Sequence, residues 1–193
     1  MVLWGATTSG PAAPPGTYQV RLTVDGKTQT QPLVVRRNPM RSTTDADLKE
    51  QFDLGIKIRD KASEANNAVI LIRSIKQQVK DRLAKSTDPQ LADAGGKLTA
   101  NLSSVEEAIY QVRNQSNQDP LNFPIKINNR IASLLRAVNT GDGKPIASID
   151  PIFQDLIGEL KVQTDKLQHV LTTDLPAFNT EAGRLKVEPV VAK

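Results

Sequence analysis

The sequence contains no cysteine among its 193 residues, which excludes disulfides, thiolate zinc sites and cysteine nucleophiles. It has one tryptophan, two tyrosines and a single histidine, so few side chains are suited to acid–base chemistry. No apolar run approaches the ~20 residues that a membrane-spanning helix requires, and we expect no membrane span. The chain is nevertheless long enough to bury a substantial core, as one domain or slightly more.

The charge pattern gives little reason to expect a nucleic-acid partner. Lysine and arginine number 25 against 21 acidic residues, a formal net charge of +4. The densest basic stretch includes only one acid, Asp81, and no aromatic side chain that could stack on bases; it comprises Arg73, Lys76, Lys80, Arg82 and Lys85. We interpret it as a solvated helix end whose cations complement the helix dipole, and we expect no nucleic-acid binding.

The first 40 residues are rich in glycine and proline and have the pattern of a β-hairpin. Alternating polarity predicts a strand with one apolar face, formed by Tyr18, Val20, Leu22 and Val24. Asp25-Gly26 supplies the positive-φ pair of a tight turn, and residues 28–35 predict the returning strand. Pro32 cannot donate to a strand ladder, which indicates an edge or a bulge.

Such a hairpin cannot bury its own apolar face in water. Val2-Leu3-Trp4 has the pattern of the end of one further strand, and Met1 precedes it without a leader segment. We therefore expect residues 1–38 to be the last part of a larger β-sandwich and the chain to be a fragment. The apolar face is then covered by the side of the helices or by a second copy of the hairpin, or else the segment is disordered.

From residue 39 onward the pattern is helical. Thr43-Thr44 followed by Asp45 and Asp47 predicts the capped start of a first helix that ends near Lys85. At 1.5 Å per residue this helix is about 61 Å long, which is typical of a bundle. Its predicted inward stripe repeats nearly every 3.5 residues and comprises Leu48, Phe52, Ile56, Arg59, Ala62, Asn66, Val69, Ile72, Lys76, Val79 and Leu83.

Three further helices are expected. Asp88-Pro89 predicts the start of the second, which has the clearest heptad pattern, formed by Leu91, Leu98, Val105 and Val112 and flanked by Leu102 and Ile109. The third presents Ile127, Ile131, Leu134, Leu135 and Val138. The fourth begins at Asp150-Pro151 and buries Phe153, Leu156, Ile157, Leu160, Thr164, Leu167 and Leu171. Pro176 is expected to break or kink it, before a short helical tail to Leu185.

Short connections between amphipathic helices favour antiparallel neighbours. The sequence thus predicts a mainly α fold: an antiparallel up-and-down bundle of four helices over residues 39–193, the first helix long, preceded by a short β-hairpin.

No residue stands out as catalytic, cofactor-binding or metal-ligating. His169 has no second histidine with which to share a metal, and we interpret it as a partly exposed structural side chain. Glu106 and Glu107 point about 100° apart on a helix and form no carboxylate pair; we attribute them to the helix dipole and solvation. The segment 141–144 lacks the flanking residues of a phosphate loop and is interpreted as a flexible connector. The sequons at Asn101 and Asn114 are weakened by a helical context.

The N-terminal third carries a family resemblance. The runs Val-Leu-Trp-Gly, Ser-Gly-Pro, Pro-Gly-Thr-Tyr-Gln-Val-Arg-Leu-Thr-Val-Asp-Gly and Thr-Gln-Pro-Leu-Val-Val-Arg-Arg-Asn-Pro resemble the C-terminal region of large bacterial BNR-repeat proteins. These are sortilin-like β-propeller proteins often labelled glycosyl hydrolases, in which an immunoglobulin-like domain and a helical segment follow the propellers. Residues 45–60 are similar to the start of that helical segment.

This resemblance implies that residues 1–38 are a partial immunoglobulin-like β segment and that the parent protein is bacterial and extracytoplasmic, either periplasmic or secreted. No Asp-box motif of the propellers occurs in the sequence, so no catalytic residue of the family can be placed here.

Two functions remain open at this point. The first is a non-catalytic C-terminal helical module that docks on the upstream propeller domains of the same protein or self-associates. The second is an accessory module of a glycosyl hydrolase or peptidase-like enzyme, whose catalytic propellers are absent from this chain. Neither requires a cofactor.

Overall fold

The computed structural model describes residues 3–5 and 9–192. Within these residues a hairpin of two strands, β1 (Gly16–Val24) and β2 (Lys27–Val35), precedes four helices. The helices are α1 (Asp45–Leu83), α2 (Pro89–Ile109), α3 (Ile127–Val138) and α4 (Ile149–Arg184), with one 3₁₀ turn at Asp119–Leu121. The predicted mainly α fold, with four helices preceded by a β-hairpin, is confirmed. The further strand expected at residues 2–4 is not: Val2 lies outside the described residues, and Leu3 and Trp4 are not in a strand.

The helices begin where the sequence places their caps. The Thr44 hydroxyl accepts a hydrogen bond from the Asp47 N–H at 3.1 Å, and the Asp47 carboxylate accepts one from the Thr44 N–H at 3.0 Å, a complete capping box. The Asp88 carboxylate caps α2 by accepting from the N–H groups of Gln90 and Leu91, both at 3.0 Å, and Pro89 occupies the first helical position.

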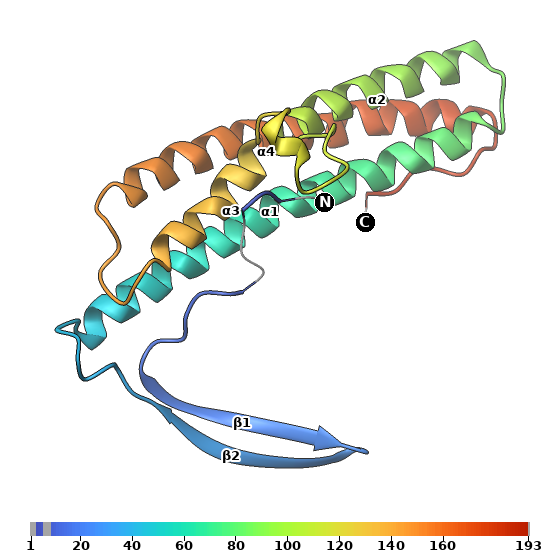
Figure 1. Ribbon diagram of the computed structural model, residues 1–193. Helices are drawn as coiled ribbons and strands as arrows, with labels where there is room; N and C mark the ends of the chain where they lie inside the picture. The colour runs from blue at the N-terminus through green and yellow to red at the C-terminus, as the bar shows by residue number, and fades with distance from the viewer. Residues whose placement is uncertain (1–2, 6–8, 193) are drawn as a thin grey trace.

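α1 is the longest helix of the bundle and packs against the other three helices. α3 and the first half of α4 lie beside the N-terminal half of α1, whereas α2 and the second half of α4 lie beside its C-terminal half (Figure 1). α2 and α3 follow one another along the bundle and run antiparallel to α1 (Figure 1). Most cross-sections therefore contain three helices, because two shorter helices together match the length of α1.

The core of the bundle is continuous and mostly aliphatic. Its largest fully buried side chains come from all four helices: Phe178, Ile58, Ile72, Ile75, Leu91, Leu98, Leu102, Ile109, Ile131, Leu156, Leu160 and Val69. The heptad positions predicted in α2 are buried at Leu91, Leu98 and Val105, but Val112 is exposed because the helix ends at Ile109.

The predicted stripe of α1 is wrong in its first half. The buried residues there are Gln51, Gly55 and Ile58, whereas Phe52 and Ile56 are only half-buried and Arg59 is exposed. A straight helix has 3.6 residues per turn, so its inward face drifts relative to a 3.5-residue repeat over this length. The N-terminal segment packs closely on α1 at Gly55, since a Cβ at this position would lie 3.0 Å from the side chain of Pro11.

α4 is continuous through Pro176, so the expected break is absent. The buried side chains of Leu175, Phe178 and Ala182 hold this stretch against the core. Their packing offsets the one backbone hydrogen bond that proline cannot make.

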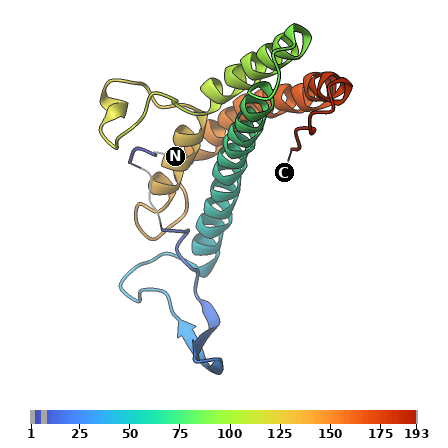
Figure 2. The same ribbon diagram turned by 90° about the vertical axis from the view of Figure 1, so that its right-hand side faces the viewer.

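The hairpin projects away from the bundle (Figures 1 and 2). Asp25 and Gly26 have φ values of 50° and 76°, and the strands pair in register from Gly16–Val35 to Val24–Lys27, as predicted. Within the described residues, neither strand packs against a helix. Of the coverings considered for the apolar face, the side of the bundle is therefore excluded.

Candidate interaction surface

One face of the hairpin carries a row of apolar side chains that is open to solvent; we call this row the hairpin apolar face. Alternation along the strands places in it Tyr18, Val20, Leu22 and Val24 of β1, with Leu33 and Val35 of β2, and the turn half of β2 borders it with the polar side chains of Lys27, Gln29 and Gln31. The side chains of Val20, Leu22 and Val24 are 53%, 62% and 57% exposed. A contiguous row of large aliphatic side chains at this exposure is the feature of the molecule that most resembles an unfilled interface.

Two linkers attach the hairpin to the bundle. The linker after β2 is held where the Arg37 guanidinium donates to the Thr43 carbonyl at 2.9 Å and the Thr43 hydroxyl donates to the Asp142 carbonyl at 2.8 Å. In the segment before β1, the Trp4 N–H donates to Asn129 Oδ1 at 2.6 Å, and Asn129 Nδ2 donates to the Trp4 carbonyl at 2.9 Å. The base of the hairpin is thus fixed to the bundle, whereas the strands β1 and β2 extend beyond it without contacting a helix.

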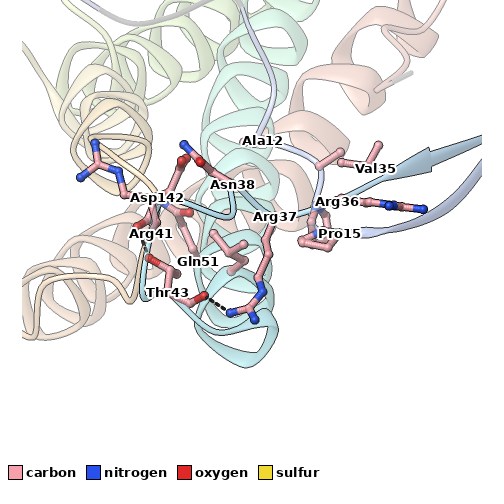
Figure 3. A pocket seen from close by; sticks show the side chains of 13 residues that line it. Ala12, Pro15, Val35, Arg36, Arg37, Asn38, Arg41, Thr43, Gln51 and Asp142 are labelled. Carbon is pink, nitrogen blue, oxygen red and sulfur yellow. Dashed lines mark hydrogen bonds between the residues drawn. The ribbon is translucent and has the colours of Figure 1, made fainter.

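A small cavity of about 120 Å³ lies between these linkers and the start of α1. Three arginines contribute to its lining, a number that suggests an anion site. Figure 3 shows, however, that the guanidinium groups of Arg36, Arg37 and Arg41 point in three different directions. Convergent donors are what phosphate or carboxylate recognition requires. We therefore assign this cavity to the hairpin attachment and not to ligand binding.

The basic stretch of α1 is not merely solvated. Glu106 on α2 is buried, and its carboxylate accepts from Arg73 Nε at 2.6 Å and from Lys76 Nζ at 3.0 Å. The Arg73 guanidinium also lies 4.9 Å from the centroid of the Tyr110 ring. The expectation that Glu106 is solvated is wrong, because it neutralises cations of α1 across the helix interface. Its neighbour Glu107 is exposed, as expected.

A second buried carboxylate ties α2 to α4. Asp174 accepts from Asn101 Nδ2 at 2.7 Å and lies 3.2 Å from Lys97 Nζ. The hydrogen bond from Asn101, and after it the bond and charge of Lys97, lower the pKa of Asp174 below its ordinary value. The side-chain amide of the sequon asparagine Asn101 is therefore hydrogen-bonded between α2 and α4.

The remaining motifs have structural roles or none. Asn114, the other sequon asparagine, is buried just beyond α2, and His169 is exposed on α4. The 141–144 connector is held more firmly than expected, because Gln51 Nε2 donates to the carbonyls of Val138 and Gly141 at 2.6 and 2.8 Å. Among the described residues no group of three potential metal ligands gathers. Nor is any described helix long and apolar enough to cross a membrane.

Comparison with known proteins yields no match, either to a family model, to a curated protein or to a solved structure.

Proposed function

We propose that this chain is a non-catalytic interaction module, in which the helical bundle is the scaffold and the hairpin is the docking element. The carrying observation is the exposure of the hairpin apolar face on a bundle whose own apolar stripes are packed against each other. Two strands alone are marginally stable in water, and unpaired strand edges are templates for further pairing. Both properties favour a hairpin that completes its sheet on another polypeptide.

The resemblance to BNR-repeat proteins supports a more specific version of this proposal. In it, the chain is the C-terminal helical module of a larger exported propeller protein, and the β-domains of that protein receive the hairpin. A β-domain suits the hairpin because it can supply both a neighbouring strand and a second layer over the apolar face.

The proposal is tested by mixing the chain with the propeller and immunoglobulin-like portion of a BNR-repeat protein and measuring mass by light scattering. We expect a complex with the intact chain and none with a variant in which Leu22→Asp places a charge on the apolar face. Because Leu22 is exposed, this variant should keep the helical circular dichroism of the parent.

A complex that forms equally with Leu22→Asp, or no complex at all, would refute docking of the hairpin on these β-domains. A complex that also changes hydrolysis by the propeller portion would support the accessory-enzyme version instead.

A further inference from the structure

The two outer edges of the hairpin differ. The two-residue turn makes Val24–Lys27 a hydrogen-bonded pair, and hydrogen-bonded and non-hydrogen-bonded pairs alternate from there toward the stem. Gln19–Pro32 is accordingly a non-hydrogen-bonded pair, so the Pro32 nitrogen faces away from β1. The free edge of β2 therefore lacks a donor near its middle.

The free edge of β1 has no such gap. Its outward N–H and C=O groups belong to the residues at the other non-hydrogen-bonded positions and at Gln19 itself, namely Thr17, Gln19, Arg21 and Thr23. None is proline, so a further strand can form a full ladder along β1 but not along β2. Figure 1 also shows the hairpin diverging from the bundle toward its turn, so the β1 edge is most open at the turn end of the strand.

We propose that the strand that joins this edge is β1 of a second copy of the chain. The two copies pair antiparallel about a two-fold axis and form one four-stranded sheet in the order β2–β1–β1–β2. This inference rests on the proposed function, because it names an occupant for the hairpin docking element.

The sequence of β1 complements itself in the one register that overlaps all nine residues. That register places Val20 opposite Val20 of the second copy, Tyr18 opposite Leu22, and Arg21 opposite the neutral Gln19. A shift of two residues in one direction would instead oppose Arg21 to itself, which is unfavourable, and a shift in either direction shortens the ladder. Because the two-fold axis is perpendicular to the sheet, both apolar faces lie on the same side and form one strip.

Val20 is the residue at the two-fold axis and forms a non-hydrogen-bonded pair there, the kind in which facing side chains are closest. A single strand pairing is a small interface, so we expect weak, concentration-dependent association. The weight-average mass of the chain in sedimentation or light scattering should rise with concentration from 21.0 kDa toward twice that value.

Charge reversal at the axis is the decisive test. We expect Val20→Lys and Val20→Glu each to stay monomeric, because each opposes like charges, whereas an equimolar mixture of the two regains the dimer. Val20 is more than half exposed, so both variants should retain the helical circular dichroism of the bundle. A mixture that stays monomeric, or a Val20→Lys variant that associates like the parent chain, overturns the proposal.

A matched pair of prolines tests which edge is used. Gln19→Pro removes one outward donor from β1, and Thr30→Pro removes one outward donor from β2. We expect loss of the dimer only with Gln19→Pro, and equal effects of the two would refute pairing through β1. A parent chain that is monomeric at every concentration but still binds the propeller portion overturns this inference alone; one that does neither overturns the proposed function as well.

Discussion

Neutralising Glu106 tests the electrostatic contact between α1 and α2. Glu106→Gln keeps the volume of the side chain but removes the charge that faces Arg73 and Lys76. Its side chain is only 5% exposed, whereas those of Arg73 and Lys76 are 45% and 29% exposed. The carboxylate is thus desolvated, and its two cationic partners keep access to water.

This asymmetry sets the expected magnitude. Removing one partner of a fully buried ion pair costs about 3–5 kcal/mol, mostly because the other charge is stranded. Arg73 and Lys76 can be rehydrated, and the glutamine can still accept one hydrogen bond. We therefore expect Glu106→Gln to lower the free energy of unfolding by about 1–3 kcal/mol, within the range for a lost charged hydrogen bond.

The measurement is urea denaturation followed by helical circular dichroism, with Glu107→Gln as the matched control. Glu107 is the adjacent residue on the same helix but is exposed, so its substitution should change stability by less than about 0.5 kcal/mol. In a double-mutant cycle, Arg73→Gln should cost less in the Glu106→Gln background than in the parent chain. Equal midpoints for Glu106→Gln and Glu107→Gln would show that the pair contributes nothing to stability.

Three further predictions follow from the packing. Leu98→Ala should cost about 2–5 kcal/mol of unfolding free energy and Ser104→Ala on the exposed face of α2 under about 0.5 kcal/mol, as urea titration would show. The lowered pKa of Asp174 means that its ionised form stabilises the fold at pH values above its unfolded-state pKa of about 4. This contribution is lost as the pH falls through the pKa of Asp174 in the folded state. Denaturant titrations at acidic pH should therefore show a smaller stability difference between the parent chain and Asp174→Asn than titrations at neutral pH. Replacing residues 16–35 with a short Gly-Ser linker should leave the thermal midpoint of the helices unchanged, whereas removing residues 1–38 should lower it, because buried Asn129 loses its partners on Trp4.

Local sequence chemistry predicted the elements well. The capping box at Thr44, the Asp88-Pro89 start of α2 and the Asp25-Gly26 turn each depend on residues within four positions of one another, and each lies where predicted. Local rules hold there because backbone groups at helix ends and turns must find partners nearby.

Contacts between distant residues could not be predicted in the same way. The burial of Glu106 depends on Arg73 and Lys76, about 30 residues earlier, and on the rotation of α1 that brings them to it. The inward position of Gln51 likewise depends on the carbonyls of Val138, at the end of α3, and of Gly141, just beyond it. A polar residue in an inward position has no signal in hydrophobic periodicity, and this adds to the drift of the 3.6-residue helix in making the predicted first half of the α1 stripe wrong.

The separation of the molecule into a packed bundle and an uncovered hairpin has an energetic consequence. The bundle buries its apolar residues without help from the strands, so its stability does not depend on whether the hairpin is docked.

The hairpin, in contrast, is held at its stem by Arg37, Thr43 and the Trp4 segment, and along its length by one ladder and the Thr23–Thr28 hydroxyl contact of 3.0 Å. Isolated two-stranded hairpins are marginal, so pairing with a further strand stabilises the hairpin itself as well as the complex. Docking and ordering of this segment are therefore coupled. Amide hydrogen exchange should show this coupling as protection of Thr17, Gln19, Arg21 and Thr23 that rises with association, while protection in α1 to α4 stays constant.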